Sequence, residues 1–234
     1  GPKSRELLKK LFPKSDVSNE GLPFMGYMEG DLFGVKARIF RISFSGELAY
    51  EVNVESDNGN FMWEKIIEVG QEFKIQPYGT EALSTLRIEM GHVAGSELDG
   101  RTIPYDNSLE GLLSKKKDFI GKRSLTRSDI VRSDRKQLVG LVPLNKAYGI
   151  EEGQHVIEEK NLNTPIKKPV KMLGHVTSSY FSPTLNHCVA MALIKGGNRK
   201  IGSQLYVSTS DLNVIPVEVV KPNFIDPKNE RLIS

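Results

Sequence analysis

The sequence predicts an α+β fold, in which a domain with a largely antiparallel sheet precedes a small β-barrel or sandwich. Three observations support this prediction. In the first half, paired β patterns are followed by two helical patterns; in the second half, short β-rich runs alternate with Gly, Pro and Asn; and a charged stretch over 126–136 separates the halves. We therefore expect one domain over 1–136 and a second over 137–234.

A β-hairpin is predicted around residues 45–46. Apolar residues alternate with polar ones on both sides of this Gly-containing turn, over 40–44 and over 48–54. Because neighbouring strand residues point to opposite faces, Tyr50 is expected on the apolar face and Glu51 on the other. The pattern alone favours a solvated Glu51 over a ligand-binding one, since Glu is rarely buried without a partner.

Two stretches before the hairpin complete this region. The alternation over 35–39 is out of phase with Phe40, and a β-bulge at Phe40 would explain the slip. The stretch 19–30 is rich in Gly and Pro and is expected to be a loop.

Three helices are predicted in the first half. The expected N-caps are Ser4, then Asp57 or Asn58, and then Thr80, and Pro13 ends the first helix. Each helix has an apolar stripe at helical spacing. The stripes are Leu7, Leu8 and Leu11; Met62, Ile66 and Val69; and Leu83, Leu86 and Met90.

Six short strands are predicted in the second half, and their regular spacing favours a small barrel or sandwich. The single cysteine, Cys188, opens an apolar run and is expected to be a small buried hydrophobe. One cysteine excludes an internal disulfide. The predicted strands are 138–142, 155–158, 174–177, 189–194, 205–207 and 214–220.

Composition places the chain among ordinary globular proteins, with 38% hydrophobic and 26% charged residues and a net charge of +3. This weak charge argues against a nucleic-acid or membrane partner, which usually needs a concentrated basic face. The basic run 115–117 is short and is followed by Asp118, so a solvated surface is favoured there. No signal peptide is visible, and we expect a cytoplasmic protein.

Motifs for the commonest cofactors are absent. The four histidines are not spaced as metal ligands, and the sequence has no P-loop, nucleophile elbow or GxGxxG fingerprint. We therefore expect no metal, and no flavin or NAD bound by this chain. Asp99 and Asp106 lack the ligand density of a calcium loop, and turn formation explains them better.

A family resemblance runs through the same stretches. Residues 41–52, RISFSGELAYEV, resemble the folate-domain hairpin of the glycine-cleavage aminomethyltransferases and their relatives, which include the folate-binding parts of dimethylglycine oxidase and of the sarcosine oxidase alpha subunit. Leu83 stands where the aminomethyltransferases usually have an arginine that contributes to their folate site. The remaining matches favour the sarcosine oxidase branch and lie at 78–91, 98–106, 116–125 and 174–183.

The resemblance covers 1–222 and implies the C-terminal part of a sarcosine oxidase alpha subunit. The chain starts without Met, and residues 1–8, GPKSRELL, resemble an internal segment of that subunit. The resemblance therefore implies that the first half of the folate domain and a flavin- and NAD-binding region precede it. In that family a flavin centre oxidises sarcosine, and tetrahydrofolate in this domain captures the one-carbon unit. Flavin and NAD are then expected only in other regions or subunits, and the other sarcosine oxidase subunits are the expected partners in a hetero-oligomer.

The resemblance also implies site residues. Glu51 matches the carboxylate that binds the pterin, and Phe44 matches its aromatic partner; Tyr50 and Tyr180 are further candidates for cofactor binding. The family's catalytic aspartate falls in the missing half, so no catalytic residue is expected here. Two other functions stay open, a stand-alone enzyme of the aminomethyltransferase type and a non-catalytic folate-binding or assembly module.

Overall fold

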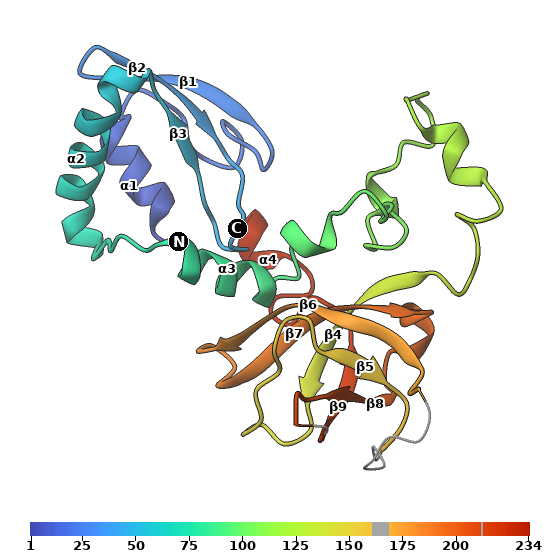
Figure 1. Ribbon diagram of the computed structural model, residues 1–234. Coiled ribbons are helices and arrows are strands. Elements are labelled where there is room, and N and C mark those ends of the chain that lie inside the picture. The colour runs from blue at the N-terminus through green and yellow to red at the C-terminus, as the bar shows by residue number, and fades with distance from the viewer. Residues whose placement is uncertain (161–168, 212) are drawn as a thin grey trace. The chain divides into compact units, whose positions relative to one another are not determined.

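The computed structural model describes residues 1–160, 169–211 and 213–234 (Figure 1). The chain forms two compact units, one made of residues 1–87 with 226–234 and the other of residues 88–225. The first contains an antiparallel sheet with helices, and the second contains a closed antiparallel barrel. The predicted α+β fold class is therefore confirmed, and the predicted domain boundary near residue 136 stays a prediction.

The first unit has two layers. Its elements are α1 (Ser4–Leu11), β1 (Tyr27–Leu32), β2 (Val35–Phe40), β3 (Glu51–Asn53), α2 (Gly59–Gly70), α4 (Glu230–Ile233) and the 3₁₀ turns Ser56–Asn58 and Gln71–Phe73; α3 (Thr80–Glu89) crosses the division between the units. The strands are ordered β1-β2-β3, and α1 and α2 cover one face of the sheet (Figure 1). Leu8, Leu11 and Met62 from the helices meet Ala37 and Ile39 from the sheet, which confirms the predicted apolar stripes of the first two helices.

The predicted hairpin forms, but its connection differs. β2 and β3 pair in antiparallel fashion, and residues 41–50 form a loop between them instead of two strand ends and a tight turn. No register shift occurs at Phe40, so the predicted β-bulge is wrong. The alternation of apolar residues is interrupted at Phe40 because β2 ends there. The next residue, Arg41, has its side chain inside the protein and is only 2% exposed.

Two further predictions in this unit need correction. The stretch 19–30 is not all loop, since β1 begins at Tyr27 and pairs with β2 along its whole length. Ser4 does not cap α1; its hydroxyl donates a hydrogen bond to the carbonyl of Leu48 at 3.0 Å. Leu48 is distant from Ser4 in sequence, so no local signal marks that contact. β1 and β2, in contrast, are neighbours in the chain and are joined by the two-residue turn 33–34, in which Gly34 has a φ of 88°.

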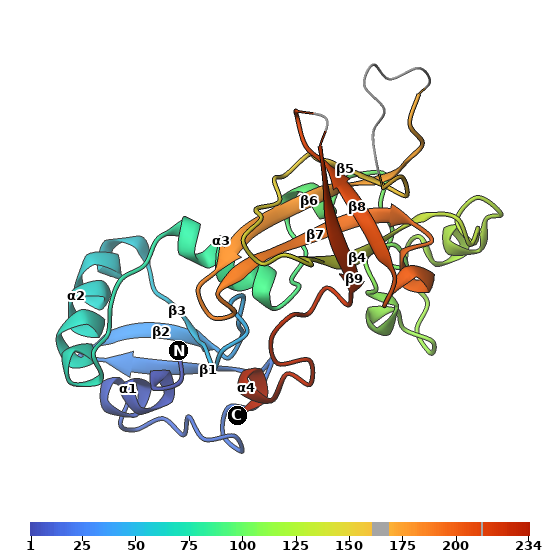
Figure 2. The same ribbon diagram turned by 90° about the horizontal axis from the view of Figure 1, so that it is seen from below.

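The second unit is built on a closed barrel with the strand order β4-β7-β6-β5-β8-β9 (Figure 2). Its strands are β4 (Lys136–Pro143), β5 (His155–Ile157), β6 (Met172–Ser182), β7 (His187–Lys195), β8 (Gln204–Ser208) and β9 (Val214–Val220), and its 3₁₀ turns are Gly95–Glu97, Glu110–Leu112, Lys122–Thr126 and Gly197–Lys200. Each of the six predicted strands is confirmed. Side chains such as Leu141, Val156 and Val217 fill the interior.

The strands β4 and β7 are buried on both faces. Ala190 and Ala192 point into the barrel, whereas Val189, Met191 and Leu193 pack on its outside against a second cluster that contains Ile88. This explains why the sequence is continuously apolar here instead of alternating. Cys188 is buried at the start of β7, as predicted.

Two buried glutamates, Glu89 and Glu97, precede the first barrel strand and accept hydrogen bonds from serines of β6. Ser182 donates a hydrogen bond to Glu89, and Ser178 donates one to Glu97 at 2.6 Å. Glu97 is fully buried. Buried polar side chains are normally hydrogen-bonded, and these two bonds link residues 89 and 97 to β6. Within the described ranges, no helix is both long and apolar enough to cross a membrane.

Candidate functional site

Glu51 lies on the face of the sheet that the helices leave open. Along β3, Val52 packs toward the core, whereas Glu51 and Asn53 are exposed. The carboxylate of Glu51 makes no hydrogen bond or ion pair with another residue in the part of the chain that the structure describes. It is therefore available to a ligand or to solvent.

Aromatic rings occupy the row beside Glu51. In the sheet register Glu51 is directly opposite Phe40, and Phe40 is directly opposite Tyr27. The rings of Tyr27 and Phe40 stack with centroids 5.7 Å apart. Residues directly opposite in an antiparallel pair project from the same face, so a carboxylate and a stacked ring pair stand in one row.

Charges are balanced in the neighbouring rows of the same face. Glu29 is directly opposite Arg38, and Asp31 is directly opposite Lys36, so each carboxylate has a cation as its cross-strand neighbour. A hollow of about 700 Å³ lies over these residues. Glu51 differs from Glu29 and Asp31 because its cross-strand neighbour is an uncharged ring.

The other predicted site residues of this unit lie elsewhere. Phe44 is in the 41–50 loop and is 45% exposed. Tyr50 packs against the core on the side opposite to Glu51, and its hydroxyl accepts a hydrogen bond from the Arg5 Nε at 3.0 Å. The structure thus places Tyr50 and Glu51 on different faces, as the alternation predicts.

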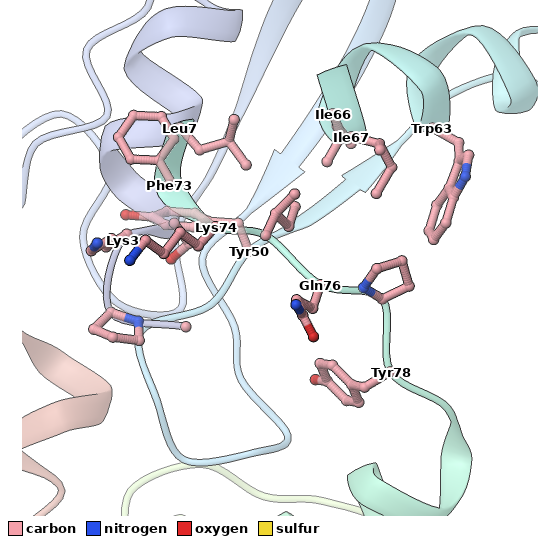
Figure 3. Close-up of a pocket in the computed structure, with 15 residues that line it drawn as sticks. Lys3, Leu7, Tyr50, Trp63, Ile66, Ile67, Phe73, Lys74, Gln76 and Tyr78 are labelled. Carbon is pink, nitrogen blue, oxygen red and sulfur yellow. The ribbon is translucent and has the colours of Figure 1, made fainter. Parts of the chain in front are cut away.

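Tyr50 lines a separate cavity of about 680 Å³ (Figure 3). The cavity lies between the start of α1, one side of α2 and residues 73–78. Trp63 of α2 and Tyr78 are more than half exposed beside it. Its walls are mainly apolar, and Glu51 and Phe44 are not among them.

Tyr180 belongs to the second unit. It lies on β6 and packs against the cluster formed by Ile88, Leu138 and Met191 on the outside of the barrel. Packing accounts for this side chain, and a role in cofactor binding stays a prediction. In the described ranges, no group of three or more His, Cys, Asp or Glu side chains is placed to hold a metal ion.

Tyr27 and Phe40 lie in the sheet row of Glu51, and the sequence does not predict either of them as a candidate site residue. Tyr27 falls in the stretch that the sequence predicts to be a loop, and Phe40 belongs to the predicted apolar alternation of the hairpin. The sequence does contain a signal at Phe40: it directly follows Ile39, the last residue of the apolar alternation over 35–39, and so falls on the other face of the strand. That position places Phe40 on the face opposite to the core.

Comparison with known proteins identifies the family. Residues 1–117 match the family described as the GCVT N-terminal domain, and residues 136–226 match the glycine cleavage T-protein C-terminal barrel domain. The chain belongs to the glycine cleavage T-protein family. The second match coincides with the closed barrel of the structure.

Several T-protein relatives are similar along nearly the whole chain. The sarcosine oxidase subunit alpha of Corynebacterium sp. (strain P-1) is 42% identical over 99% of this chain, and that of Rhizobium meliloti (strain 1021) is 39% identical over 99%. The chain spans 24% and 23% of these relatives. The aminomethyltransferase of Halothermothrix orenii is 31% identical over 96% of this chain, which spans 59% of it.

A solved structure supports the fold of this T-protein chain. The crystal structure of glycine cleavage system aminomethyltransferase T from Bartonella henselae matches with a TM-score of 0.78 at 21% identity, covering 97% of this chain and 58% of that protein. At this identity the likeness establishes the fold alone.

Proposed function

We propose that this chain is the folate-binding part of a sarcosine oxidase alpha subunit, where tetrahydrofolate takes up the one-carbon unit released when sarcosine is oxidised elsewhere in the protein. The observation that carries the proposal is the 42% identity to the Corynebacterium subunit over 99% of this chain, against 31% for the aminomethyltransferase. Flavin and NAD belong, on this proposal, to other regions or subunits, and the partners are the remaining subunits of the enzyme.

Glu51 is proposed to bind the edge of the pterin ring through hydrogen bonds. An ionised carboxylate accepts two parallel hydrogen bonds, and a pterin presents an N–H and an amino group side by side. The exposure of Glu51, together with the absence of a partner within the described chain, fits this role. Tetrahydrofolate, when bound, supplies the amine nitrogens that accept the one-carbon unit.

Aromatic contacts to the pterin are proposed from two places. Phe44 is the ring that the family pattern supplies, and the Tyr27–Phe40 pair lies in the same sheet row as Glu51. Flat rings favour offset stacking or edge contacts with other aromatic rings. Glu51, Phe44 and Phe40 therefore form the core of the proposed site, and Tyr50 supports it from the opposite face of the sheet.

A stand-alone enzyme of the aminomethyltransferase type is the second candidate. It is favoured by the match to the Halothermothrix orenii enzyme, of which this chain spans 59%. Leu83, in place of the arginine usual in that class, speaks against it. A flavin-binding region encoded upstream in the same reading frame would support the sarcosine oxidase over the stand-alone enzyme. The third candidate, a non-catalytic module, would bind folate without turnover even in the full-length protein.

The test is Glu51→Gln in the full-length protein. The substitution keeps the shape but removes the charge and half of the acceptor capacity. We expect tetrahydrofolate binding to weaken by about 1.5–3 kcal/mol, the scale of a hydrogen bond to a charged group. Calorimetry gives the affinity, and product assays should show sarcosine oxidation nearly unchanged, with formaldehyde released in place of methylene-tetrahydrofolate.

The matched control is Glu29→Gln on the same face of the sheet. Glu29 is exposed like Glu51 but is balanced by Arg38, so this variant should bind tetrahydrofolate as the wild type does. Glu47 is a poorer control because it pairs with Arg231 at 3.1 Å. Unchanged affinity in Glu51→Gln would show that Glu51 is only a solvated surface residue.

A further inference from the structure

A small groove lined mainly by charged residues lies on the outside of the barrel, within the second unit. Its volume is about 330 Å³, and it is bordered by β4, β6 and β7 and by the segment around Asp99 and Asp106. Five lysines and arginines line it, against three aspartates. The groove therefore carries excess positive charge, and it plays no part in the function proposed for Glu51.

Two lysines face each other at the edge of this groove. Lys136 of β4 is directly opposite Lys195 of β7 in the antiparallel register. Neither ammonium group forms an ion pair or a hydrogen bond with a residue of the described ranges. Like charges directly opposite each other in a sheet are destabilising, so folding of the chain alone does not account for this pair.

The aspartates of the groove do not neutralise these lysines, because each aspartate already forms an ion pair with an arginine. Arg101 donates to Asp99 at 2.8 Å, and Arg135 donates to Asp106 at 2.9 Å. The third aspartate, Asp134, accepts from Arg132 at 3.0 Å. The uncompensated positive charge is thus concentrated on Lys136 and Lys195.

A histidine lies beside the lysine pair. His175 of β6 is directly opposite Leu193 of β7, two residues before Lys195. The pKa of His175 is lowered by burial and then by the positive charges of Lys136 and Arg101, with a smaller effect of His155; Asp99 opposes them. An anion in the groove would offset the repulsion that these cations exert on a protonated His175.

We propose that this groove binds a small oxyanion, a phosphate or a carboxylate group, between Lys136 and Lys195. The two ammonium groups supply the charge, and the groove is large enough for such a group. Charge-assisted hydrogen bonds from lysine to these anions are among the stronger polar contacts in proteins. The repulsion between the lysines is relieved when the anion is bound.

The experiment titrates inorganic phosphate, and in a second arm malonate, into the 234-residue chain at constant ionic strength. The His175 ring resonances are followed by NMR, and thermal unfolding is measured in parallel. Binding should saturate, raise the pKa of His175 and raise Tm, because a ligand that binds the folded state stabilises it. A response to phosphate alone identifies a phosphate site, and a response to malonate identifies a carboxylate site.

Two variants with the same change of charge are compared. Lys136→Gln with Lys195→Gln should bind the anion about tenfold more weakly or worse, the effect of losing contacts to a charged group. In chloride alone this variant should unfold at the same or a higher temperature than the wild type, because the repulsion is removed. The control Lys115→Gln with Lys116→Gln changes exposed lysines outside the groove and should leave binding unchanged.

Two results would overturn the proposal. One is an unchanged His175 pKa and Tm in both anions at constant ionic strength. The other is equal binding by the groove variant and the wild type. The single variant Lys195→Gln repeats the comparison if the double variant does not fold.

Discussion

Arg41 is a buried arginine that joins distant parts of the first unit. It is 2% exposed, and its guanidinium donates to the Asn19 side chain at 2.6 Å and to the carbonyls of Leu22, Ile233 and Ser234 at 3.1, 3.0 and 2.7 Å. Burial lowers the pKa of Arg41, and the nearby charge of Arg5 adds to that effect. The arginine of the recognised hairpin stretch thus has a structural role.

Replacing Arg41 by methionine tests this role. The substitution leaves the Asn19 oxygen and several carbonyls without their donor. Each buried acceptor that stays unsatisfied lowers the free energy of unfolding by about 1–3 kcal/mol. We expect Arg41→Met to lower the free energy of unfolding by about 2–4 kcal/mol. Urea unfolding measures it. Arg38→Met, on the exposed face of β2, should change stability by less than about 0.5 kcal/mol; equal losses would contradict the assignment.

At the scale of elements, strand β6 explains much of the recognised stretch 174–183. A Cβ on Gly174 would lie 1.9 Å from the carbonyl oxygen of Leu193, so only glycine allows β6 to approach β7 this closely. Ser178 and Ser182 hold the buried carboxylates described above. These motif residues are accounted for by the architecture of the barrel.

The segment before β4 is the element that tests the predicted domain boundary. Arg127 and Arg132 are exposed, and no strand covers 126–135. Because an unpaired exposed backbone is cut more readily than a strand, a protease of broad specificity should cleave within 126–136 before it cleaves within any described strand. Mass spectrometry of the first fragments locates the cut. Earlier cleavage within 174–194 would contradict a boundary near residue 136.

At the scale of the whole molecule, the depressed pKa of His175 makes stability depend on pH. The ordinary histidine pKa of 6.5 applies to the unfolded chain, and the folded value is lower. As the pH falls from 6.5 toward the lower pKa of the folded state, the unfolded state binds more protons than the folded state, so the free energy of unfolding decreases. Above 6.5 both states are neutral at this residue and the effect vanishes.

The measurement is the urea midpoint between pH 8 and pH 5 in phosphate-free buffer. His175→Gln should lose less stability than the wild type on acidification, because it has no proton to take up in the unfolded state. His155→Gln, on the exposed end of β5, is the control and should keep most of the wild-type slope. Identical slopes for wild type and His175→Gln would show that His175 is not responsible.

The sequence by itself determined the features that depend on neighbouring residues. Periodicity located α1, α2 and the six barrel strands, and alternation placed Glu51 opposite to Tyr50. The recognised stretches gave the family, which the matches over 1–117 and 136–226 confirm. These signals are local, because helical and strand periods repeat within a few residues.

Only the tertiary structure decided which residues meet across the sheets. The register of β1 against β2 sets Tyr27 and Phe40 beside Glu51, and the register of β4 against β7 brings Lys136 opposite Lys195. β4 and β7 are far apart in the chain, and in either pair a shift of one residue would turn every side chain to the other face. Register depends on the packing of the whole unit, so the local pattern predicted the strands but not the rows of residues that make the candidate sites.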